Sequence, residues 1–432
     1  MMKKKTDLAE YVMETLKLIN FIIAILFSVC YAYQCIYIPI VWFFAKKKKT
    51  PKAEMKNRFA VLICARNEEA VIADLIGSID RQTYPADKRT VFVLADNCTD
   101  RTAEIAGQAG AVVYTRRNDK LVGKGYALAE LLGHIKEDYP EGFDGYFVFD
   151  ADNLLAKDYI EKMNDTFSAG NDIVTCYRNS KNIGDNWITA GYGVYFMRES
   201  RYLNHARSII GSSCAVSGTG FLFSRKIAEE LNGWPFHLLT EDIEFSADQI
   251  VRGRKIAFCA EAQLFDEQPT GFGQSFVQRM RWSKGYLQVF FRYAGRLLRG
   301  LFHGSFSCYD MAMANIPAFI LSAASVICNV ALGICGAIMH DDLTVGLFSI
   351  GQTLLNMYLA MFAMGLITTV TEWNYIHMGN GKKILYLFTF PIYMFTFIPI
   401  SVAAIFVRIR WKPIRHTHSL SGMKENEKAL FR

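Results

Sequence analysis

The ten cysteines include no Cys-x-x-Cys pair and no zinc-like spacing. This absence excludes the common zinc modules, and scattered cysteines fit reduced thiols in a cytosolic domain, where disulfides are rare. The sequence also lacks internal repeats and low-complexity linkers. With 432 residues, we therefore expect one large soluble domain accompanied by membrane helices.

Charged residues are missing from four long stretches, which cover residues 18–45, 311–339, 343–371 and 384–407. Each stretch exceeds the roughly 20 residues that a spanning helix needs. Buried core helices are the competing interpretation, which four uncharged runs of this length disfavour. A cleaved signal peptide is disfavoured too, because the first run is too long and four lysines at 46–49 follow it. The sequence predicts an integral membrane protein.

Basic residues flank the first and last apolar runs. Lysines occupy 46–49, 52 and 56, and the last run is followed by Arg408, Arg410, Lys412 and Arg415. Such clusters are typical of cytoplasmic juxtamembrane segments, where they also attract anionic lipid. Nucleic-acid binding is the alternative, which we reject because the clusters adjoin membrane segments and the soluble middle is near charge balance. We predict the lipid bilayer as a partner and no nucleic acid.

Strand-like and helix-like stretches alternate between residues 57 and 270. Strands are expected at 59–64, 91–94, 111–114 and 146–149, with helices ending near 79 and 109 and another at 125–135. This alternation predicts a mostly parallel sheet with both faces covered. Ligands of such sheets bind beyond the carboxyl ends of the strands. Asn67, Asp96 and Asp150 follow strands, so we expect them to converge on one crevice.

The motif Asp150-Ala151-Asp152 ends the strand at 146–149. Alternate residues at a strand end can point two carboxylates into one site. Mg²⁺ typically binds one or two carboxylates together with substrate phosphates. An exposed acidic pair without function is the competing interpretation, and the position after a buried strand favours a metal site.

Two further elements of the predicted crevice suit a nucleotide. Asp96 could accept hydrogen bonds from a base or ribose, although Asp is also favoured as a helix N-cap. Gly123-Lys124-Gly125 opens a helix, and a helix N-terminus with a lysine suits a phosphate. A flexible glycine turn is the alternative there.

Thr240-Glu241-Asp242 precedes an amphipathic stretch. Asp242 could take the proton from an attacking hydroxyl as a general base. The alternative is a capping arrangement, with Thr240 as N-cap and the two acids near the positive end of the helix dipole.

Residues 276–302 show apolar positions at helical spacing, with basic residues on the other side. This pattern predicts an amphipathic helix in the bilayer interface rather than an ordinary surface helix. The helix carries Gln278, Arg281 and Trp282. A guanidinium binds diphosphate oxygens bidentately, and an indole suits a sugar face or the membrane interface. Simple membrane anchoring is the competing interpretation.

These elements, in this order, resemble the processive, membrane-integrated glycosyltransferases of family 2, which include cellulose, chitin and hyaluronan synthases. The resemblance covers nearly the whole chain and implies a GT-A, Rossmann-like α/β domain between transmembrane helices. It implies that Asp96 contacts uracil and that Lys124 lies near the nucleotide. Asp150 and Asp152 would then bind ribose, diphosphate and Mg²⁺ or Mn²⁺.

The same resemblance assigns the acceptor side. Gly218-Thr219-Gly220 would lie beside the acceptor sugar, and Asp242, within the triplet that contains Glu241, would be the base. Gln278, Arg281 and Trp282 match the Gln-x-x-Arg-Trp motif, which binds diphosphate and stacks near the acceptor.

We therefore expect a processive inverting enzyme that polymerises a UDP-sugar, with UDP-glucose favoured, into a β-linked glycan that crosses the plasma membrane. One alternative is a chitin- or hyaluronan-like synthase using UDP-N-acetylglucosamine. Another is a non-processive lipid glycosyltransferase, which the Gln-x-x-Arg-Trp motif disfavours. A channel or carrier with a regulatory nucleotide domain is the non-enzymatic alternative.

The expected organisation places the first span and its flank at 1–50 and the cytosolic catalytic domain at 51–272. The interfacial helix follows at 273–305, further spans at 306–410 and a basic tail at 411–432. The short tail leaves no room for a cyclic-dinucleotide sensor. One span before the domain and three after it would put the basic tail outside, against the positive-inside rule. Pro391 and Pro399 make the last run the candidate for a re-entrant segment.

Overall fold

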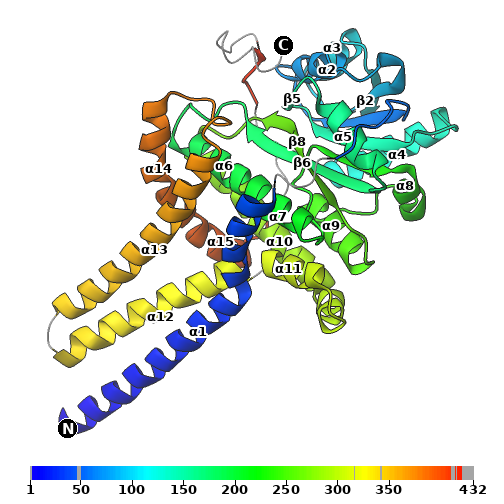
Figure 1. The fold of residues 1–432 in the computed structure, drawn as a ribbon. Helices are drawn as coiled ribbons and strands as arrows, with labels where there is room; N and C mark the ends of the chain where they lie inside the picture. The colour runs from blue at the N-terminus through cyan, green and yellow to red at the C-terminus, as the bar shows by residue number, and fades with distance from the viewer. Residues whose placement is uncertain are drawn as a thin grey trace.

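The computed structural model describes residues 2–45, 50–315, 317–340, 343–409, 414 and 416–420. An α/β domain forms one end of the molecule, and long helices extend from it toward the N-terminus (Figure 1). The basic residues at 46–49, 410, 412 and 415, and most of the tail at 411–432, lie outside the described residues.

An eight-stranded mixed sheet forms the centre of the domain, with the order β3-β2-β1-β4-β7-β6-β8-β5. The four predicted strands are confirmed and pair in parallel, whereas β7 is antiparallel to both β4 and β6. The strands are β1 Phe59–Ala65, β2 Arg89–Asp96, β3 Val112–Arg116, β4 Gly145–Asp150, β5 Leu154–Leu155, β6 Ile173–Ser180, β7 Phe221–Ser224 and β8 Ala257–Asp266.

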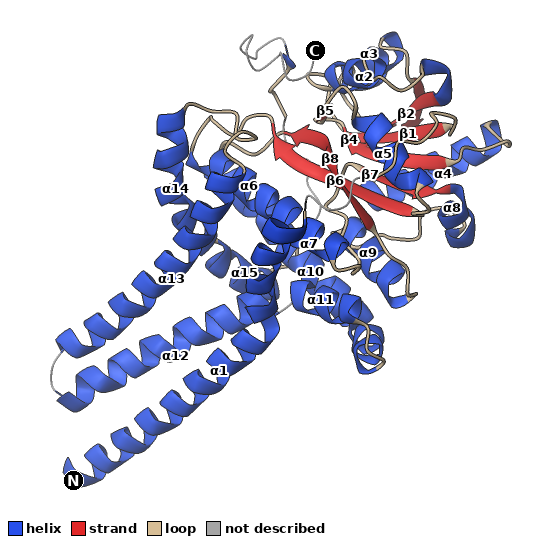
Figure 2. Ribbon diagram, viewed as in Figure 1, coloured by secondary structure: helices blue, strands red, loops and turns tan. Residues whose placement is uncertain are grey.

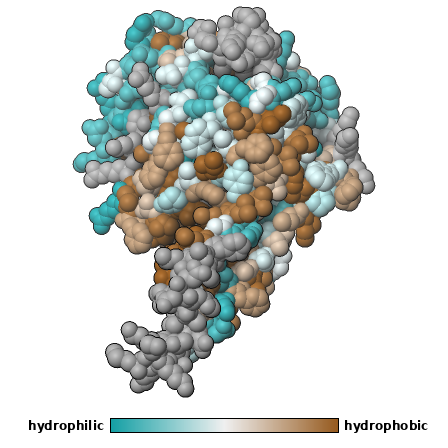
Figure 3. Space-filling view, turned by 90° about the vertical axis from the view of Figure 1, so that its left-hand side faces the viewer, coloured by the Kyte–Doolittle hydropathy of each residue, from teal (hydrophilic) through white to brown (hydrophobic). Residues whose placement is uncertain are grey.

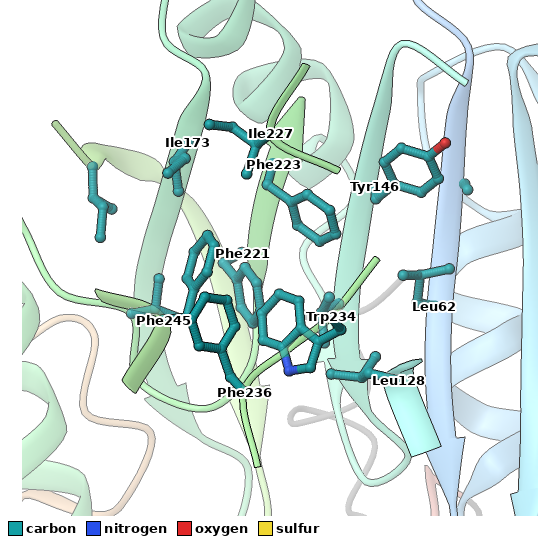
Figure 4. Close-up of a cluster of buried hydrophobic side chains, with 14 of the residues drawn as sticks. Leu62, Leu128, Tyr146, Ile173, Phe221, Phe223, Ile227, Trp234, Phe236 and Phe245 are labelled. Atoms are coloured by element: carbon teal, nitrogen blue, oxygen red, sulfur yellow. The ribbon is translucent and has the colours of Figure 1, made fainter. Parts of the chain in front are cut away.

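Both faces of the sheet are covered, as the continuous apolar strands require. The covering helices are α2 Ile72–Asp80, α3 Thr102–Gln108, α4 Lys124–Asp138, α5 Tyr159–Ser168 and α8 Arg225–Leu231 (Figure 2). On one face, aromatic side chains from β7, from the loop after α8 and from helix α9 Glu241–Val251 pack together (Figure 4); they are Phe221, Phe223, Trp234, Phe236 and Phe245. Large apolar side chains removed from water on both faces stabilise the sheet that carries the predicted crevice.

Tight turns follow β1 and β2. Asn67 and Asn97 adopt positive φ values of 59° and 52°, a conformation that Asn tolerates better than most residues. Their side chains bind neighbouring backbone: Asn67 Oδ1 accepts from Thr99 N at 2.8 Å, and Asn97 Oδ1 accepts from Asn118 N at 2.8 Å. These bonds fix the loops at the carboxyl ends of the strands, where the site lies.

A second group of helices joins the sheet to the long apolar helices. It comprises α6 Trp187–Arg198, a π-helical turn Glu199–Asn204, α7 His205–Ile209, α9 Glu241–Val251, α10 Phe272–Phe302 and α11 Phe306–Asn315.

Helix α10 is amphipathic, but only part of its basic face is available to the bilayer interface that the sequence predicts for it. Phe291 and Phe302 remain 78% and 84% exposed, so part of the apolar stripe is open. Of the basic residues, Arg292 and Arg296 pair with Glu244 and Asp248 of α9. These two arginines of the basic face therefore bind the α/β domain, because α9 presents carboxylates to them.

The long apolar helices are α1 Met2–Phe44, α12 Pro317–His340, α13 Leu343–Thr371, α14 Asn380–Phe395 and α15 Phe397–Phe406. Within the described residues, three stretches are long and apolar enough to cross a membrane: Met13–Phe44, Ile350–Thr371 and Asn380–Phe406. A shorter apolar stretch, Ala323–Gly336, lies in α12. Hydrophobic residues gather across the middle of the view in Figure 3, and hydrophilic residues lie mainly over its upper part.

The last apolar run is interrupted at Thr396, between α14 and α15. Pro399 lies in the first turn of α15, where a missing N–H costs little. Both ends of this helix pair contact the α/β domain. Lys382 Nζ, in the first turn of α14, donates to Gly184 O at 2.6 Å, and Leu420 N, beyond α15, donates to Asp74 Oδ2 at 2.6 Å. The chain thus returns to the side from which the pair begins.

A buried ion pair ties α1 to the domain. Asp310 of α11 receives Nε and Nη2 of Arg207 at 2.6 and 2.8 Å. The hydroxyls of Tyr33 and Tyr37, both on α1, donate to the same carboxylate at 2.7 and 2.9 Å. Every oxygen of this buried acid is therefore used, which is what a buried charge requires.

Candidate active site

A cavity lies at the carboxyl ends of the parallel strands, where the sequence predicts it. The described residues that line it include nine carboxylates and four Lys or Arg side chains. Nearly all predicted site residues line it: Asp96, Lys124, Asp150, Asp152, Gly218, Glu241, Asp242, Gln278, Arg281 and Trp282. Three motifs far apart in the sequence therefore share one cavity.

The Asp-x-Asp motif is held from two sides. Lys124, the first residue of α4, pairs with Asp150 and donates to Gly218 O at 2.7 Å. Asp152 is 5% exposed, and its Oδ2 accepts from Glu267 N at 2.8 Å. Lys124 therefore links the Asp-x-Asp motif to the glycine loop.

The loop Gly218-Thr219-Gly220 supports the motif. Gly218 has a φ of +78° and lines the cavity. Thr219 and Gly220 do not line it: Thr219 Oγ1 accepts from Asp150 N at 2.9 Å, and Gly220 N donates to Val148 O at 2.9 Å. The structure thus places these two residues beneath the Asp-x-Asp motif.

Asp96 ends β2, and its carboxylate accepts from Arg116 Nη1 at 2.6 Å. The helix-cap alternative is wrong, because α3 begins several residues later, after Arg101. Asp96 is 4% exposed and contributes to the cavity wall.

Thr240-Glu241-Asp242 forms the start of α9. Thr240 occupies the N-cap position without a capping side-chain bond, so the capping interpretation fails for its hydroxyl. Burial raises the pKa of Asp242, while the charges of Lys124 and Arg281 oppose this rise. Burial and the charge of Asp242 raise the pKa of Glu241 to about 7. Two buried acids that titrate nearer neutrality are typical of a proton-transfer site.

Helix α10 carries the third motif to the same place. A Cβ on Gly285 would lie 2.5 Å from Thr240 Oγ1, so glycine is what allows α10 to approach the start of α9. Gln278 Oε1 accepts from Tyr192 OH at 2.8 Å. Trp282 packs edge-on against Tyr192 and Phe196, with ring centroids 5.8 and 5.9 Å apart.

The sequence reasoning missed the contribution of the segment after α15. His416 reaches into the cavity, where its Nδ1 lies 2.9 Å from Glu68 Oε2 and its Nε2 lies 4.0 Å from Asp152 Oδ2. Thr417 N and His418 N both donate to Glu267. Local sequence gives no sign of this, because the segment has no periodicity and its partners lie more than 100 residues away.

The cavity suits a divalent cation. Among the described lining residues, nine carboxylates outnumber four Lys or Arg side chains and His416, so an anionic diphosphate needs additional positive charge to bind. Burial disfavours the imidazolium of His416, yet Asp152, Glu68 and Glu267 raise its pKa to about 10. Among the described residues, no three His, Cys, Asp or Glu side chains are grouped closely enough to hold a metal ion by themselves. One or two carboxylates together with substrate phosphates are the ligands that Mg²⁺ typically takes, and the carboxylates of the cavity suit that role.

Residues 57–285 match the family model described as glycosyltransferase like family 2. Because this match covers more than half of the chain, the protein belongs to that family and is a glycosyltransferase. The chain is 26% identical over 239 residues to a β-monoglucosyldiacylglycerol synthase of Synechocystis, covering 54% of this chain and 48% of that protein.

Two other similarities extend the comparison. A poly-β-1,6-N-acetyl-D-glucosamine synthase of Staphylococcus aureus is 22% identical over 297 residues, covering 65% of this chain and 64% of that protein. The mannosyltransferase PcManGT of Pyrobaculum calidifontis, solved with GDP-Man and Mn²⁺, superposes with a TM-score of 0.52 at 15% identity, covering 90% and 99% of the two chains. This superposition shows that the chain has the GT-A-like fold. The chain spans about half the length of the first curated relatives that it matches.

Proposed function

We propose that this protein transfers a hexose from a UDP-sugar, with inversion, to a hydroxyl of a lipid acceptor at the membrane surface. One observation carries the proposal: the aromatic side chains that line the cavity are continuous with the apolar helices. We call these side chains the aromatic wall; they are Tyr195, Phe196, Trp282 and Tyr286. Tyr195 of that wall stacks on Phe397 of α15, with ring centroids 5.9 Å apart. A lipid headgroup can therefore reach the base while its acyl chains stay beside apolar helices.

The relatives support a lipid acceptor more than the processive polymerase that the motifs suggest. The first curated relatives are named β-monoglucosyldiacylglycerol synthases. The similarity to a poly-N-acetylglucosamine synthase keeps polymer synthesis as the second candidate.

The proposed reaction needs one base and a stabilised leaving group. The acceptor oxygen attacks the anomeric carbon, its proton passes to the Asp242 carboxylate, and the bond from the anomeric carbon to the diphosphate oxygen breaks. UDP departs with the bonding electrons. Arg281 and Lys124 lie close enough to the buried acids to influence their pKa values, and their charges suit the departing diphosphate.

Asp150 and Asp152 would hold Mg²⁺ or Mn²⁺ together with substrate phosphates, and His416 would join them once the metal displaces the proton from Nε2. A bound divalent cation neutralises negative charge that develops on a departing diphosphate. Glu68 would orient His416 through Nδ1, as carboxylates commonly do for metal-binding histidines.

We also propose a membrane topology. Helices α1, α12 and α13 cross the bilayer, while α14 and α15 enter and leave on the side of the catalytic domain. The contacts of Lys382 and Leu420 with the α/β domain support this arrangement. A re-entrant pair keeps the tail and the catalytic domain together in the cytosol, in accord with the basic flanks.

The test is UDP release by the purified protein in vesicles, with UDP-glucose or UDP-N-acetylglucosamine and with diacylglycerol or glucosyldiacylglycerol. A glycolipid product one hexose larger supports the proposal. Long glycan chains would favour the second candidate, and no UDP release with any pair would contradict transferase activity on these substrates.

A further inference from the structure

A carboxylate outside the three motifs also faces the cavity. Glu199 begins the π-helical turn between α6 and α7, and such turns occur frequently at functional sites. Ser217 Oγ donates to Glu199 Oε1, and this is the one hydrogen bond described for the carboxylate. Because Ser217 precedes Gly218 of the glycine loop, this bond holds Glu199 beside that loop, on the wall of the cavity that Asp242 also lines.

Two tyrosine hydroxyls accompany it. Tyr195 and Tyr286 line the same cavity, and the structure describes no hydrogen bond for either hydroxyl. The charge of Glu199 acts on both tyrosines, and that of Asp242 acts on Tyr286, so these groups are close together. These half-buried groups face the cavity, so a ligand in the cavity can supply hydrogen-bond partners to them.

The charge of this end of the cavity limits the ligand. Arg178 lies 3.7 Å from the centroid of the Phe196 ring, and its charge is paired with that of Asp266. A phosphate here would meet Glu199 and Asp242. An uncharged ligand with several hydroxyls could instead donate to the carboxylate while a ring face packs on Trp282.

We propose that Glu199, with Tyr195 and Tyr286, forms an acceptor subsite for an uncharged, polyhydroxylated headgroup such as a sugar. Glu199 accepts a hydrogen bond from a second hydroxyl of the acceptor, beside the hydroxyl that Asp242 deprotonates. The subsite therefore favours a sugar-headed lipid over diacylglycerol, whose single hydroxyl leaves Glu199 unpaired, and over anionic lipids. This inference rests on the proposed glycosyl transfer and specifies its acceptor.

The experiment compares kcat/KM for glucosyldiacylglycerol, diacylglycerol and phosphatidylglycerol in vesicles of a zwitterionic lipid. The wild-type protein should prefer glucosyldiacylglycerol about tenfold or more, since a hydrogen bond to a charged group contributes about 1.5–3 kcal/mol. Glu199→Gln should reduce this preference mainly through the acceptor KM. Tyr286→Phe should raise the same KM while removing one oxygen atom. Glu104→Gln, on the exposed surface of α3, is the matched control.

Calorimetric titration with UDP separates acceptor binding from folding. UDP affinity of Glu199→Gln within about twofold of wild type supports an acceptor role. Equal preference for the three lipids in the wild-type protein, or an unchanged preference in Glu199→Gln, would overturn it. Joint loss of UDP binding and transfer in both variants would assign Glu199 and Tyr286 to structural support. If the wild-type protein glycosylates only soluble oligosaccharides, the lipid proposal fails, and the same variants test the subsite with those acceptors.

Discussion

At the scale of single residues, Asp242 lines the cavity beside Glu241, and burial raises its pKa. Asp242→Asn keeps the shape of the side chain but cannot take the proton. We expect transfer to fall by about 10²–10⁴-fold while UDP-sugar binding persists. Single-turnover assays with a parallel binding titration check this. Near-normal turnover would remove Asp242 from the role of base.

The pH dependence follows from the same acids. Burial raises the pKa of both Glu241 and Asp242, so each carboxylate takes up a proton at a higher pH than an exposed acid. Only the ionised base accepts a proton, so kcat/KM should decline with falling pH, and this decline should begin at a higher pH than the ordinary pKa of an exposed aspartate would give. Glu241→Gln removes a neighbouring negative charge and should move this decline to lower pH. A rate that stays constant down to pH 5 would contradict the prediction.

Asp152 is the residue through which metal and nucleotide binding should be coupled. Asp152→Ala removes a proposed ligand, so we expect weaker Mn²⁺-dependent UDP binding as well as a lower rate. Titration of UDP with and without Mn²⁺ measures the coupling, and electron paramagnetic resonance of Mn²⁺ measures metal binding directly. Full activity in excess chelator would count against a metal in this site.

At the scale of elements, α10 contributes two neighbouring side chains to the site, which contact different groups. Trp282 faces the aromatic wall, whereas Arg281 acts on the acids of α9. Trp282→Ala should therefore lower transfer far more than UDP affinity, because we propose that the ring contacts the acceptor. Arg281→Ala should weaken UDP binding, because a guanidinium pairs with diphosphate. Calorimetry and a product assay on the same purified variants distinguish these effects. Equal losses in both assays for Trp282→Ala would indicate a structural role.

At the scale of the whole molecule, the buried pair Arg207–Asp310 connects α1 and α11 to the catalytic domain. Asp310→Asn removes the counter-charge and leaves Arg207 buried without it. Breaking such a pair typically costs about 3–5 kcal/mol, so the unfolding midpoint in detergent should fall clearly. Asp87→Asn removes an exposed ion pair and serves as the control, with little expected change. Equal midpoints for the two variants would show that the pair does not stabilise the assembly.

The whole-molecule view also explains the role of the C-terminal segment. Residues 416–420 bind Glu68, Asp74 and Glu267, which belong to the loops and helices around the cavity. The re-entrant topology proposed for α14 and α15 brings these residues to the donor side. A segment expected as a basic tail therefore contributes a side chain to the site.

The sequence by itself determined the parts of this protein that depend on local pattern. Apolar strands followed by polar residues predicted β1 to β4, and the carboxyl-end rule placed Asp96, Asp150 and Asp152 together. Uncharged runs predicted the long helices. These features follow from hydrophobic periodicity and strand direction, which neighbouring residues encode.

Only the tertiary structure decided the rest. The antiparallel entry of β7, the pairing of the basic face of α10 with α9, and the arrival of His416 beside Asp152 depend on contacts between distant segments. The motif Gly218-Thr219-Gly220 predicts substrate contact for Thr219 and Gly220, yet packing places both residues under Asp150. Glu199 carries no motif at all, and the π-helical turn and the bond from Ser217 direct its carboxylate to the cavity. Long-range packing sets where a side chain points, and no local pattern records it.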